Sequence, residues 1–180
     1  MLSLFFIRHG ESEANVQGLV DGQGDSLLSE NGERQAHEAG RLAVENGQKF
    51  DAIICSTQER AMKTARILAG HLEFPYDDII YKDELRERGC GDYEKGPLDK
   101  YHEAPEELAV KEHGVEPMDS LYERSKKVVD WIKQTYPDKT VLLVGHSGSG
   151  KMLRIVAEGR DADEFDKTVT IPNTSIIRLI

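Results

Sequence analysis

Two histidines and two arginines of this 180-residue sequence follow, directly or within a few residues, short apolar runs that are typical of buried β-strands: Arg8, His9, Arg60 and His146. The carboxyl ends of the strands in an open, parallel α/β sheet lie at one edge, where ligands bind. Arginine forms bidentate, charge-assisted hydrogen bonds to phosphate oxygens. Neighbouring cations lower the pKa of a histidine and so keep its imidazole neutral and nucleophilic. The sequence therefore predicts chemistry on a phosphoryl group at this edge.

Each of these histidines lies next to a glycine, Gly10 or Gly145, which permits close approach to a ligand. A single histidine is more often structural than catalytic, but two at equivalent strand ends favour a catalytic role. The other four histidines fall inside or at the ends of expected helices and are interpreted as surface residues: His37, His71, His102 and His113. Neither an H-E-x-x-H motif nor paired C-x-x-C motifs occur, so we expect no metal site and no cofactor.

The stretch GHSGSGK (145–151) also fits the G-x-x-x-x-G-K pattern of a phosphate-binding loop, which would imply a P-loop nucleotide-binding protein. This alternative is disfavoured because Met152 stands where such a loop carries a hydroxyl group for Mg²⁺. The stretch also departs from a G-x-S-x-G nucleophile elbow, since Ser149 occupies the last glycine position. We therefore expect Lys151 to be a solvated charge on a helix surface.

Apolar patterns along the chain predict alternating strands and helices. The expected strands cover residues 2–7, 51–55, 79–81, 141–144 and 175–180. The expected helices cover residues 29–47, 56–71, 119–136 and a stretch after 144 that carries Met152, Ile155 and Val156. Ser56 with Glu59 has capping-box spacing, and Asp119 can cap the third of these helices. The alternation predicts a three-layer α/β/α sandwich with a mostly parallel central sheet.

Length and composition are typical of one soluble domain over residues 1–180, with 38% hydrophobic and 31% charged residues. A net charge of −10 disfavours nucleic-acid and membrane partners, although a few local cations can still bind a small anionic substrate. No run approaches the ~20 apolar residues of a membrane helix, and residues 2–7 are too short for a signal peptide. Cys55 and Cys90 give no disulfide framework, so we expect a cytoplasmic protein. The sequence leaves the oligomeric state open.

A series of motifs, in order along the chain, resembles the signature of the histidine phosphatase superfamily, also called the phosphoglycerate mutase-like family. These motifs are FIRHGESEAN, LLSENGERQA, STQERAMKTA, LRERGCGDYEKG, VGHSG and IPNTSI. They extend over essentially the whole chain. The resemblance implies a single histidine phosphatase domain with a phosphoglycerate mutase-like fold. It also implies a small phosphorylated substrate and a reaction that needs no metal.

The resemblance further implies a role for each residue at the strand ends. His9 would attack phosphorus and become phosphorylated. The phosphoryl oxygens would be held, and the charge of the transition state stabilised, by Arg8, Arg60 and His146. Asn15 would add a phosphate contact. The implied intermediate is therefore a phosphohistidine.

Glu87 is implied to protonate the leaving oxygen and then to activate the water that hydrolyses the phosphohistidine. The L-x-E spacing favours it over Glu84, and the negative charge of a bound phosphate would favour its protonated form. The backbone N–H of Ser147 is implied as another phosphate contact. Gln23 is a candidate substrate contact, or alternatively part of an ordinary turn. Cys90 lies close to Glu87 in the sequence, but nothing marks it as reactive.

The chain departs from the family pattern at several positions, none of which removes a catalytic group: Thr57, Lys63, Tyr93, Lys95 and Ser147. Because some of these lie in the substrate-facing loop, the resemblance does not identify the substrate. The acidic stretch 83–123 could be a solvated helical face or could cover the active site. A catalytically inactive binding module is disfavoured because every expected catalytic group is present.

Two sequence features bear on the choice between a phosphatase and a mutase. Arg88, directly after Glu87, is typical of the mutase branch, which would return the phosphoryl group to a phosphorylated sugar acid. The given sequence stops at Ile180, directly after the last expected strand, without a tail that would exclude water from the site. We therefore predict a phosphoric monoester hydrolase, with a phosphoglycerate mutase as the alternative.

Overall fold

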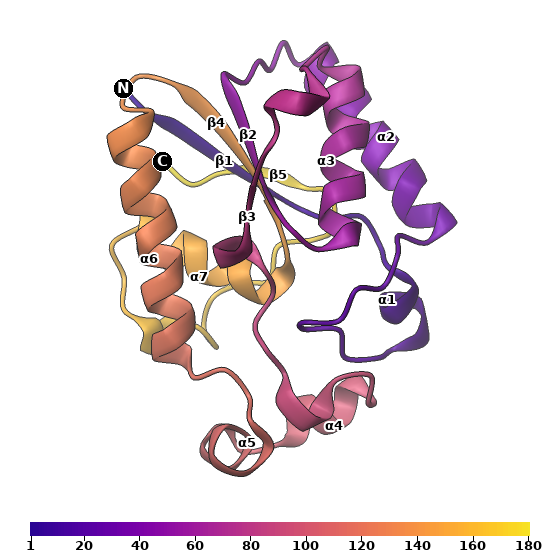
Figure 1. Ribbon diagram of the computed structural model, residues 1–180, viewed down its shortest axis with the longest axis vertical. Helices are drawn as coiled ribbons and strands as arrows, with labels where there is room; N and C mark the ends of the chain where they lie inside the picture. The colour runs from indigo at the N-terminus through magenta and orange to yellow at the C-terminus, as the bar shows by residue number, and fades with distance from the viewer.

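One five-stranded sheet forms the centre of the computed structural model, which describes residues 1–180 (Figure 1). Its strands are β1 (Ser3–Arg8), β2 (Ala52–Ser56), β3 (Ile80–Lys82), β4 (Thr140–Gly145) and β5 (Ile176–Arg178). They lie in the order β3-β2-β4-β1-β5, and all neighbours are parallel except β1 and β5. The predicted mostly parallel central sheet is therefore confirmed.

Helices cover both faces of the sheet (Figure 1). The helices α2 (Glu30–Glu45) and α3 (Glu59–His71) lie on one face, whereas α6 (Met118–Thr135) and α7 (Ser147–Ala157) lie on the other. This arrangement confirms the predicted three-layer α/β/α sandwich. None of the helices combines the length and the apolar composition needed to span a membrane.

Alternate residues of the central strands face opposite layers of the sandwich. In β2, Ala52 and Ile54 join the core cluster under α6 and α7, whereas Ile53 and Cys55 join the cluster under α2 and α3. Because both faces are buried, the sequence of such a strand is a continuous apolar run rather than an alternating pattern. Burial on both faces holds the strands in place, and with them the residues at their carboxyl ends.

Several short helices escaped the sequence prediction: α1 (Glu13–Gln17), α4 (Leu98–Glu103), α5 (Glu106–His113) and the 3₁₀ helices Tyr76–Asp78, Asp83–Leu85, Gly91–Tyr93 and Ala162–Glu164. They bury few side chains, with none buried in α4 and only Ala109 in α5. A helix without a buried apolar stripe shows no periodicity in its sequence. In Figure 1, α4 and α5 lie below the sheet, beyond the strand ends that lead into α1 and α7.

Two predicted helix starts are wrong. Ser56 does not cap a helix but ends β2, and α3 begins at Glu59. The Ser56 hydroxyl group lies 2.8 Å from Nε2 of His146 and accepts a hydrogen bond from the N–H of Gln58. Asp119 is the second residue of α6 rather than its cap, although a carboxylate in the first turn still interacts favourably with the helix dipole.

Two glycines let α2 pack directly on the loop that follows β1. A Cβ atom on Gly10 would overlap the carbonyl oxygen of Gly32, and a Cβ atom on Gly32 would overlap that of Glu11. At the same junction, the Gln35 side chain accepts a hydrogen bond of 2.9 Å from the N–H of Glu11. Direct backbone contact therefore holds this loop against the first turn of α2.

We expect Gly32→Ala to destabilise the protein by about 1–3 kcal/mol, because the added methyl group must push two backbone segments apart. Urea-induced unfolding measures the change. Gly70→Ala is the matched control, since it also lies inside a helix but its Cβ atom would meet only the hydroxyl end of Tyr76. There a gain in helix propensity of up to about 1 kcal/mol opposes the cost of moving that hydroxyl group. Equal losses in the two variants would contradict the role given to Gly32.

Candidate active site

A cavity of about 350 Å³ opens at the carboxyl ends of the strands. Its lining includes most of the predicted site residues: Arg8, His9, Asn15, Arg60, Glu87 and Ser147. His146 is completely buried, and its ring centroid lies 5.1 Å from that of His9. The structure thus brings together residues that lie far apart in the sequence, because parallel strands end at the same edge of the sheet.

The hydrogen bonds of His9 fix its tautomer. Its Nδ1 lies 2.6 Å from the carbonyl oxygen of Gly10, which can only accept, so Nδ1 carries the proton. Nε2 therefore has a lone pair, toward which the Nε–H of Arg60 points from 3.3 Å.

Two residues that the sequence reasoning missed hold the backbone around His9. The Gly10 N–H donates to the Thr64 hydroxyl group at 3.1 Å, and the Asn173 side chain donates to the His9 carbonyl at 2.7 Å. Both residues lie within stretches that carry the family resemblance, STQERAMKTA and IPNTSI. Their place in these motifs was the one indication of their importance in the sequence, although a motif does not reveal what its residues contact.

His9 and His146 are both neutral at physiological pH. Burial is the main cause that lowers the pKa of His9 well below its ordinary value of 6.5, followed by the charges of Arg60 and Arg8. Burial also lowers the pKa of His146, and Arg60 is the second cause. Neutral His9, with its unprotonated Nε2, therefore has the form that a nucleophile needs.

Two buried nitrogen atoms at the site have no hydrogen-bond partner: Nδ1 of His146 and Nε of Arg8. The Nη1 group of Arg8 donates to the Ile171 carbonyl over a long distance of 3.3 Å. An unpaired buried polar atom costs free energy, so nearly all such atoms are paired in native proteins. Both atoms therefore lack the partner that a buried polar atom ordinarily has.

Arg60 is almost fully buried and is held by the loop that follows α1. Its Nη1 lies 2.8 Å from the carboxylate of Asp21. Its Nη groups also donate to the carbonyl oxygens of Asp21 (2.7 Å), Gly24 (2.8 Å) and Gly22 (3.3 Å). The protein itself thus binds most of this guanidinium, and only the Nε–H points at His9. Asp21 could not be predicted from the sequence, since a lone acidic residue in a glycine-rich turn forms no recognisable motif.

The carboxylate of Glu87 lies at the N-terminus of α7. Its Oε2 accepts a hydrogen bond of 2.9 Å from the N–H of Gly148, and its Oε1 accepts bonds of 2.8 Å from Ser149 and Arg88. The free N–H groups and the dipole of a helix favour an anion at this end. Because Oε2 accepts only one of the three bonds, it keeps a lone pair that can take a proton.

The two residues predicted to contact the substrate through polar side chains, Asn15 and Gln23, differ in their position relative to the cavity. Asn15 lines the cavity, and its Oδ1 accepts a hydrogen bond from the N–H of Ser12 at the start of α1. Gln23 is not among the lining residues, because its side chain donates to the Glu87 carbonyl and accepts from Arg86. In this structure Gln23 therefore holds the segment that carries Glu87.

The segment after β3 forms one wall of the cavity. Leu98, Tyr101 and His102 of α4 line it, so part of the acidic stretch does cover the site. Cys90 also belongs to the lining, but it is buried, and burial raises the pKa of its thiol to about 12. The thiol therefore stays protonated and is a poor nucleophile.

Lys151 differs from the sequence-based expectation. It is half-buried and lines the cavity, with its ammonium group 4.1 Å from the centroid of the Phe165 ring. Burial lowers the pKa of this lysine. It is therefore a cation in the wall of the cavity rather than a solvated surface charge.

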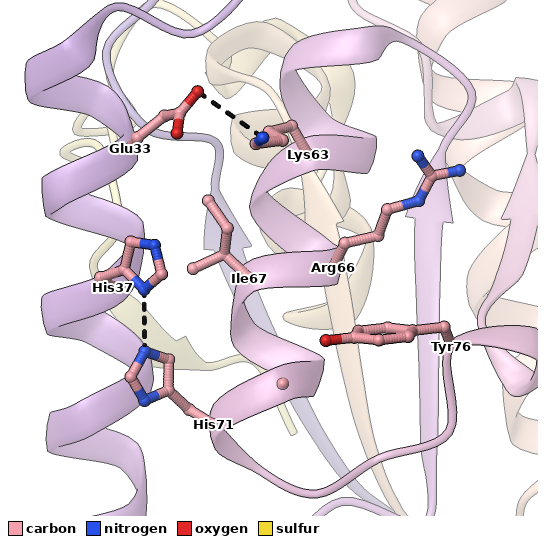
Figure 2. A pocket seen from close by; sticks show the side chains of 8 residues that line it. Glu33, His37, Lys63, Arg66, Ile67, His71 and Tyr76 are labelled. Atoms are coloured by element: carbon pink, nitrogen blue, oxygen red, sulfur yellow. Dashed lines mark hydrogen bonds and ion pairs between the residues drawn. The ribbon is translucent and has the colours of Figure 1, made fainter.

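A second hollow of about 540 Å³ contains none of the predicted catalytic residues (Figure 2). His37 of α2 and His71 of α3 point toward each other there, with Nδ1 of the first 3.0 Å from Nε2 of the second. Lys63 and Arg66 belong to the same lining. No group of three or more His, Cys, Asp or Glu side chains that could hold a metal ion occurs in the structure.

The chain is similar to known proteins over nearly its whole length. The family model of the histidine phosphatase superfamily (branch 1) matches residues 4–180. The chain is 31% identical over 164 residues to the uncharacterized phosphatase PhoE of Bacillus subtilis (strain 168), covering 91% of this chain and 81% of that protein. It is 30% identical over 174 residues to a 2,3-bisphosphoglycerate-dependent phosphoglycerate mutase of Bartonella henselae, covering 91% and 84% of the two chains. The structure of Bacillus stearothermophilus YhfR aligns with a TM-score of 0.85 and 26% identity, covering 99% of this chain and 90% of the other.

The two buried, neutral histidines should make the free energy of unfolding depend on pH. In the unfolded chain they titrate near 6.5, whereas in the folded protein their pKa values lie well below 6.5. Between these values the unfolded state binds more protons, so the stability is complete above pH 6.5 and is lost as the pH falls below it. We expect each histidine to contribute up to about 1.4 kcal/mol per pH unit in that range.

Urea unfolding of the wild type and of His9→Gln, at a series of pH values from about 7.5 down to about 5.5, measures this dependence. The variant should lose less stability over the range, because it lacks one of the two groups. His37→Gln is the control and should follow the wild type, since His37 is exposed. An identical loss in the wild type and His9→Gln would show that His9 does not contribute.

Proposed function

This chain belongs to the histidine phosphatase superfamily, and from that premise we propose that it is a metal-independent phosphatase of small phosphomonoesters. The state of His9 is the observation that carries the proposal. Its proton lies on Nδ1, and the lone pair of Nε2 accepts a hydrogen bond from the Nε–H of Arg60. A phosphoryl group brought to Nε2 would meet a nucleophile flanked by cationic donors.

In the first step, Nε2 of His9 attacks phosphorus, a P–N bond forms and the P–O bond to the leaving group breaks. Arg8, the Nε–H of Arg60 and the unpaired Nδ1 of His146 are the groups available to the phosphoryl oxygens. Glu87, protonated on Oε2, transfers its proton to the leaving oxygen. An alcohol departs, and a phosphohistidine and the Glu87 carboxylate remain.

In the second step, the Glu87 carboxylate takes a proton from a water molecule, the water oxygen attacks phosphorus and the P–N bond breaks. Three backbone N–H groups donate hydrogen bonds to this carboxylate. Inorganic phosphate leaves, Nε2 of His9 regains its lone pair and Glu87 is protonated again. The cycle therefore restores both groups without a cofactor.

Arg88 is the residue that favours a mutase as the second candidate, and its contacts weaken that argument. Its guanidinium lines the cavity, but Nε donates to the Glu116 carbonyl at 2.7 Å and Nη2 forms an ion pair with Glu106. A guanidinium held in this way has few N–H groups left for a second substrate group. We therefore place hydrolysis ahead of transfer to a phosphorylated sugar acid.

The cavity supports a small substrate. Its volume of about 350 Å³ is near the lower end of the range of ligand sites, roughly 300–1,000 Å³. Leu19 and Leu98 give the cavity apolar surface, and Lys151 adds a positive charge to its lining. Both cysteines are free and buried, which supports a reducing, cytoplasmic location.

We expect the purified protein to hydrolyse p-nitrophenyl phosphate in the presence of EDTA, because arginine side chains supply the positive charge. His9→Ala should lower kcat/KM by at least about 1,000-fold, since the P–N bond of the first step can then no longer form. His37→Ala is the control and should retain the wild-type rate, because His37 lies outside the cavity. Release of p-nitrophenol measures the activity of the wild type with EDTA and of the two variants. Full activity of His9→Ala would contradict the nucleophile assignment, and loss of activity with EDTA would contradict metal independence.

A panel of phosphorylated metabolites, ranked by kcat/KM, separates hydrolysis from mutase activity. We expect release of inorganic phosphate to be the main reaction, because Arg88 is bound to Glu106 and Glu116. Phosphate release and isomer formation are measured together on the phosphoglycerates, with and without 2,3-bisphosphoglycerate. Rapid bisphosphoglycerate-dependent isomerisation with little phosphate release would favour the mutase instead.

A further inference from the structure

Gln58 is a fully buried polar side chain with three backbone partners. Its Nε2 donates to the carbonyl oxygens of Gly22 and Gly24, at 2.8 and 2.7 Å. Its Oε1 accepts a hydrogen bond of 2.8 Å from the N–H of Glu87. Both amide protons and the amide oxygen are thus used, as a buried amide requires.

This side chain does not serve the helix that it precedes. Gln58 is the N-cap residue of α3, but its side chain makes no capping hydrogen bond. Two of its bonds cross to the loop after α1, and the third crosses to the segment after β3. The contacts of the amide therefore join three parts of the chain around the cavity.

The carbonyl groups that bind Gln58 also bind the arginine of the phosphoryl site. Arg60 donates to Gly24 at 2.8 Å and to Gly22 at 3.3 Å. Gln58 and Arg60 are two residues apart at the start of α3. Two side chains from one end of this helix therefore donate hydrogen bonds to the same pair of carbonyl groups. Through its oxygen, Gln58 connects this loop to the main chain of Glu87.

The peptide groups on both sides of Glu87 are held by side chains. Gln58 binds the N–H of Glu87, whereas Arg124 donates to its carbonyl oxygen at 3.0 Å and Gln23 donates to the same oxygen. The carboxylate is bound separately by the N-terminus of α7. Removal of the Gln58 amide would leave the Glu87 N–H without this partner. The main chain that carries Glu87 would then be held only on its carbonyl side.

We propose that Gln58 is a positioning residue for proton transfer. It fixes the main chain of Glu87 relative to the loop that holds Arg60, and so places the Glu87 carboxyl group at the leaving oxygen. The inference rests on the proposed function, because Glu87 needs this placement only if it protonates a leaving group. The step concerned is the break of the P–O bond, during which the proton of Oε2 moves to the leaving oxygen. A shift of about 1 Å in such a group can cost on the order of 100-fold in rate.

Two kinds of phosphomonoester differ in their need for that proton. An alkoxide is a poor leaving group and must be protonated as the P–O bond breaks, whereas p-nitrophenolate leaves as a stable anion. The ratio kcat/KM covers only the steps up to departure of the leaving group, so it excludes the hydrolysis of the phosphohistidine. A defect in the position of Glu87 therefore lowers kcat/KM for an alkyl phosphate more than for an aryl phosphate.

The test is Gln58→Met, which keeps the length of the side chain and removes all three hydrogen bonds. Its kcat/KM is measured for p-nitrophenyl phosphate and for the alkyl phosphate that the wild type hydrolyses best. We expect a fall of about 10- to 100-fold for the alkyl phosphate and of no more than about 3-fold for the aryl phosphate. Glu87→Gln is the reference for a lost acid and should show a larger difference in the same direction.

Gln35→Met is the matched control. The Gln35 amide also accepts a hydrogen bond from a backbone N–H, that of Glu11, but it contacts neither Glu87 nor the loop that holds Arg60. It should change kcat/KM of both substrates by the same factor. Gln58→Asn serves if the methionine variant does not fold, because its shorter amide cannot reach all three partners and should give the same difference between substrates. Thermal unfolding verifies that each variant is folded.

Equal losses for the two substrates in folded Gln58 variants would overturn the inference and leave Gln58 a purely structural role. Unchanged rates for both substrates would overturn it as well. If the wild type hydrolyses no phosphomonoester, the proposed function fails instead. The two failures are therefore distinguishable within one set of measurements.

Discussion

The buried ion pair between Arg60 and Asp21 is the interaction on which the rest of the site depends. A guanidinium removed from water is strongly unfavourable without a partner, so the loop that carries Asp21 must close over it. The same positive charge helps to lower the pKa of His9 and of His146, which keeps both rings neutral. The carbonyl groups of this loop also bind Gln58, and through it the segment of Glu87. One buried cation thus organises the loop, the neutral state of His9 and the placement of Glu87.

The N-terminus of α7 explains why the stretch GHSGSGK resembles a phosphate-binding loop. A glycine-rich turn between a strand and a helix exposes N–H groups that favour an anion. Here the anion is the carboxylate of Glu87, bound by Gly148 and Ser149, rather than the phosphate of a nucleotide. The lysine of the pattern, Lys151, instead lies over Phe165 in the cavity wall. The local pattern therefore indicates the electrostatics of the turn correctly but does not identify the group that it binds.

The parts of the fold that the sequence predicted are those with strong burial. The central strands are apolar on both faces, and the large helices each bury an apolar stripe, so their patterns were sufficient to place them within a few residues. The predicted start of α3 at Ser56 failed because the hydroxyl group of that residue binds His146, which lies 90 positions away. The short helices α4 and α5 were not predicted for a different reason. Neither has an apolar face buried in the core, since α4 buries no residue and α5 only Ala109.

The sequence by itself determined the layered α/β architecture and the set of residues that gather at one edge of the sheet, because apolar runs and strand ends are local features. The motif around Glu87 also singled out a residue that lines the cavity. Only the tertiary structure decided which protons and charges these residues carry and what holds them. The Nδ1 proton of His9 depends on the carbonyl group of Gly10 and the charge of Arg60 on the carboxylate of Asp21. The three bonds of Gln58 depend on backbone groups of distant segments. Backbone carbonyl and N–H groups are the same in every residue, so no pattern of side chains can reveal which of them will meet.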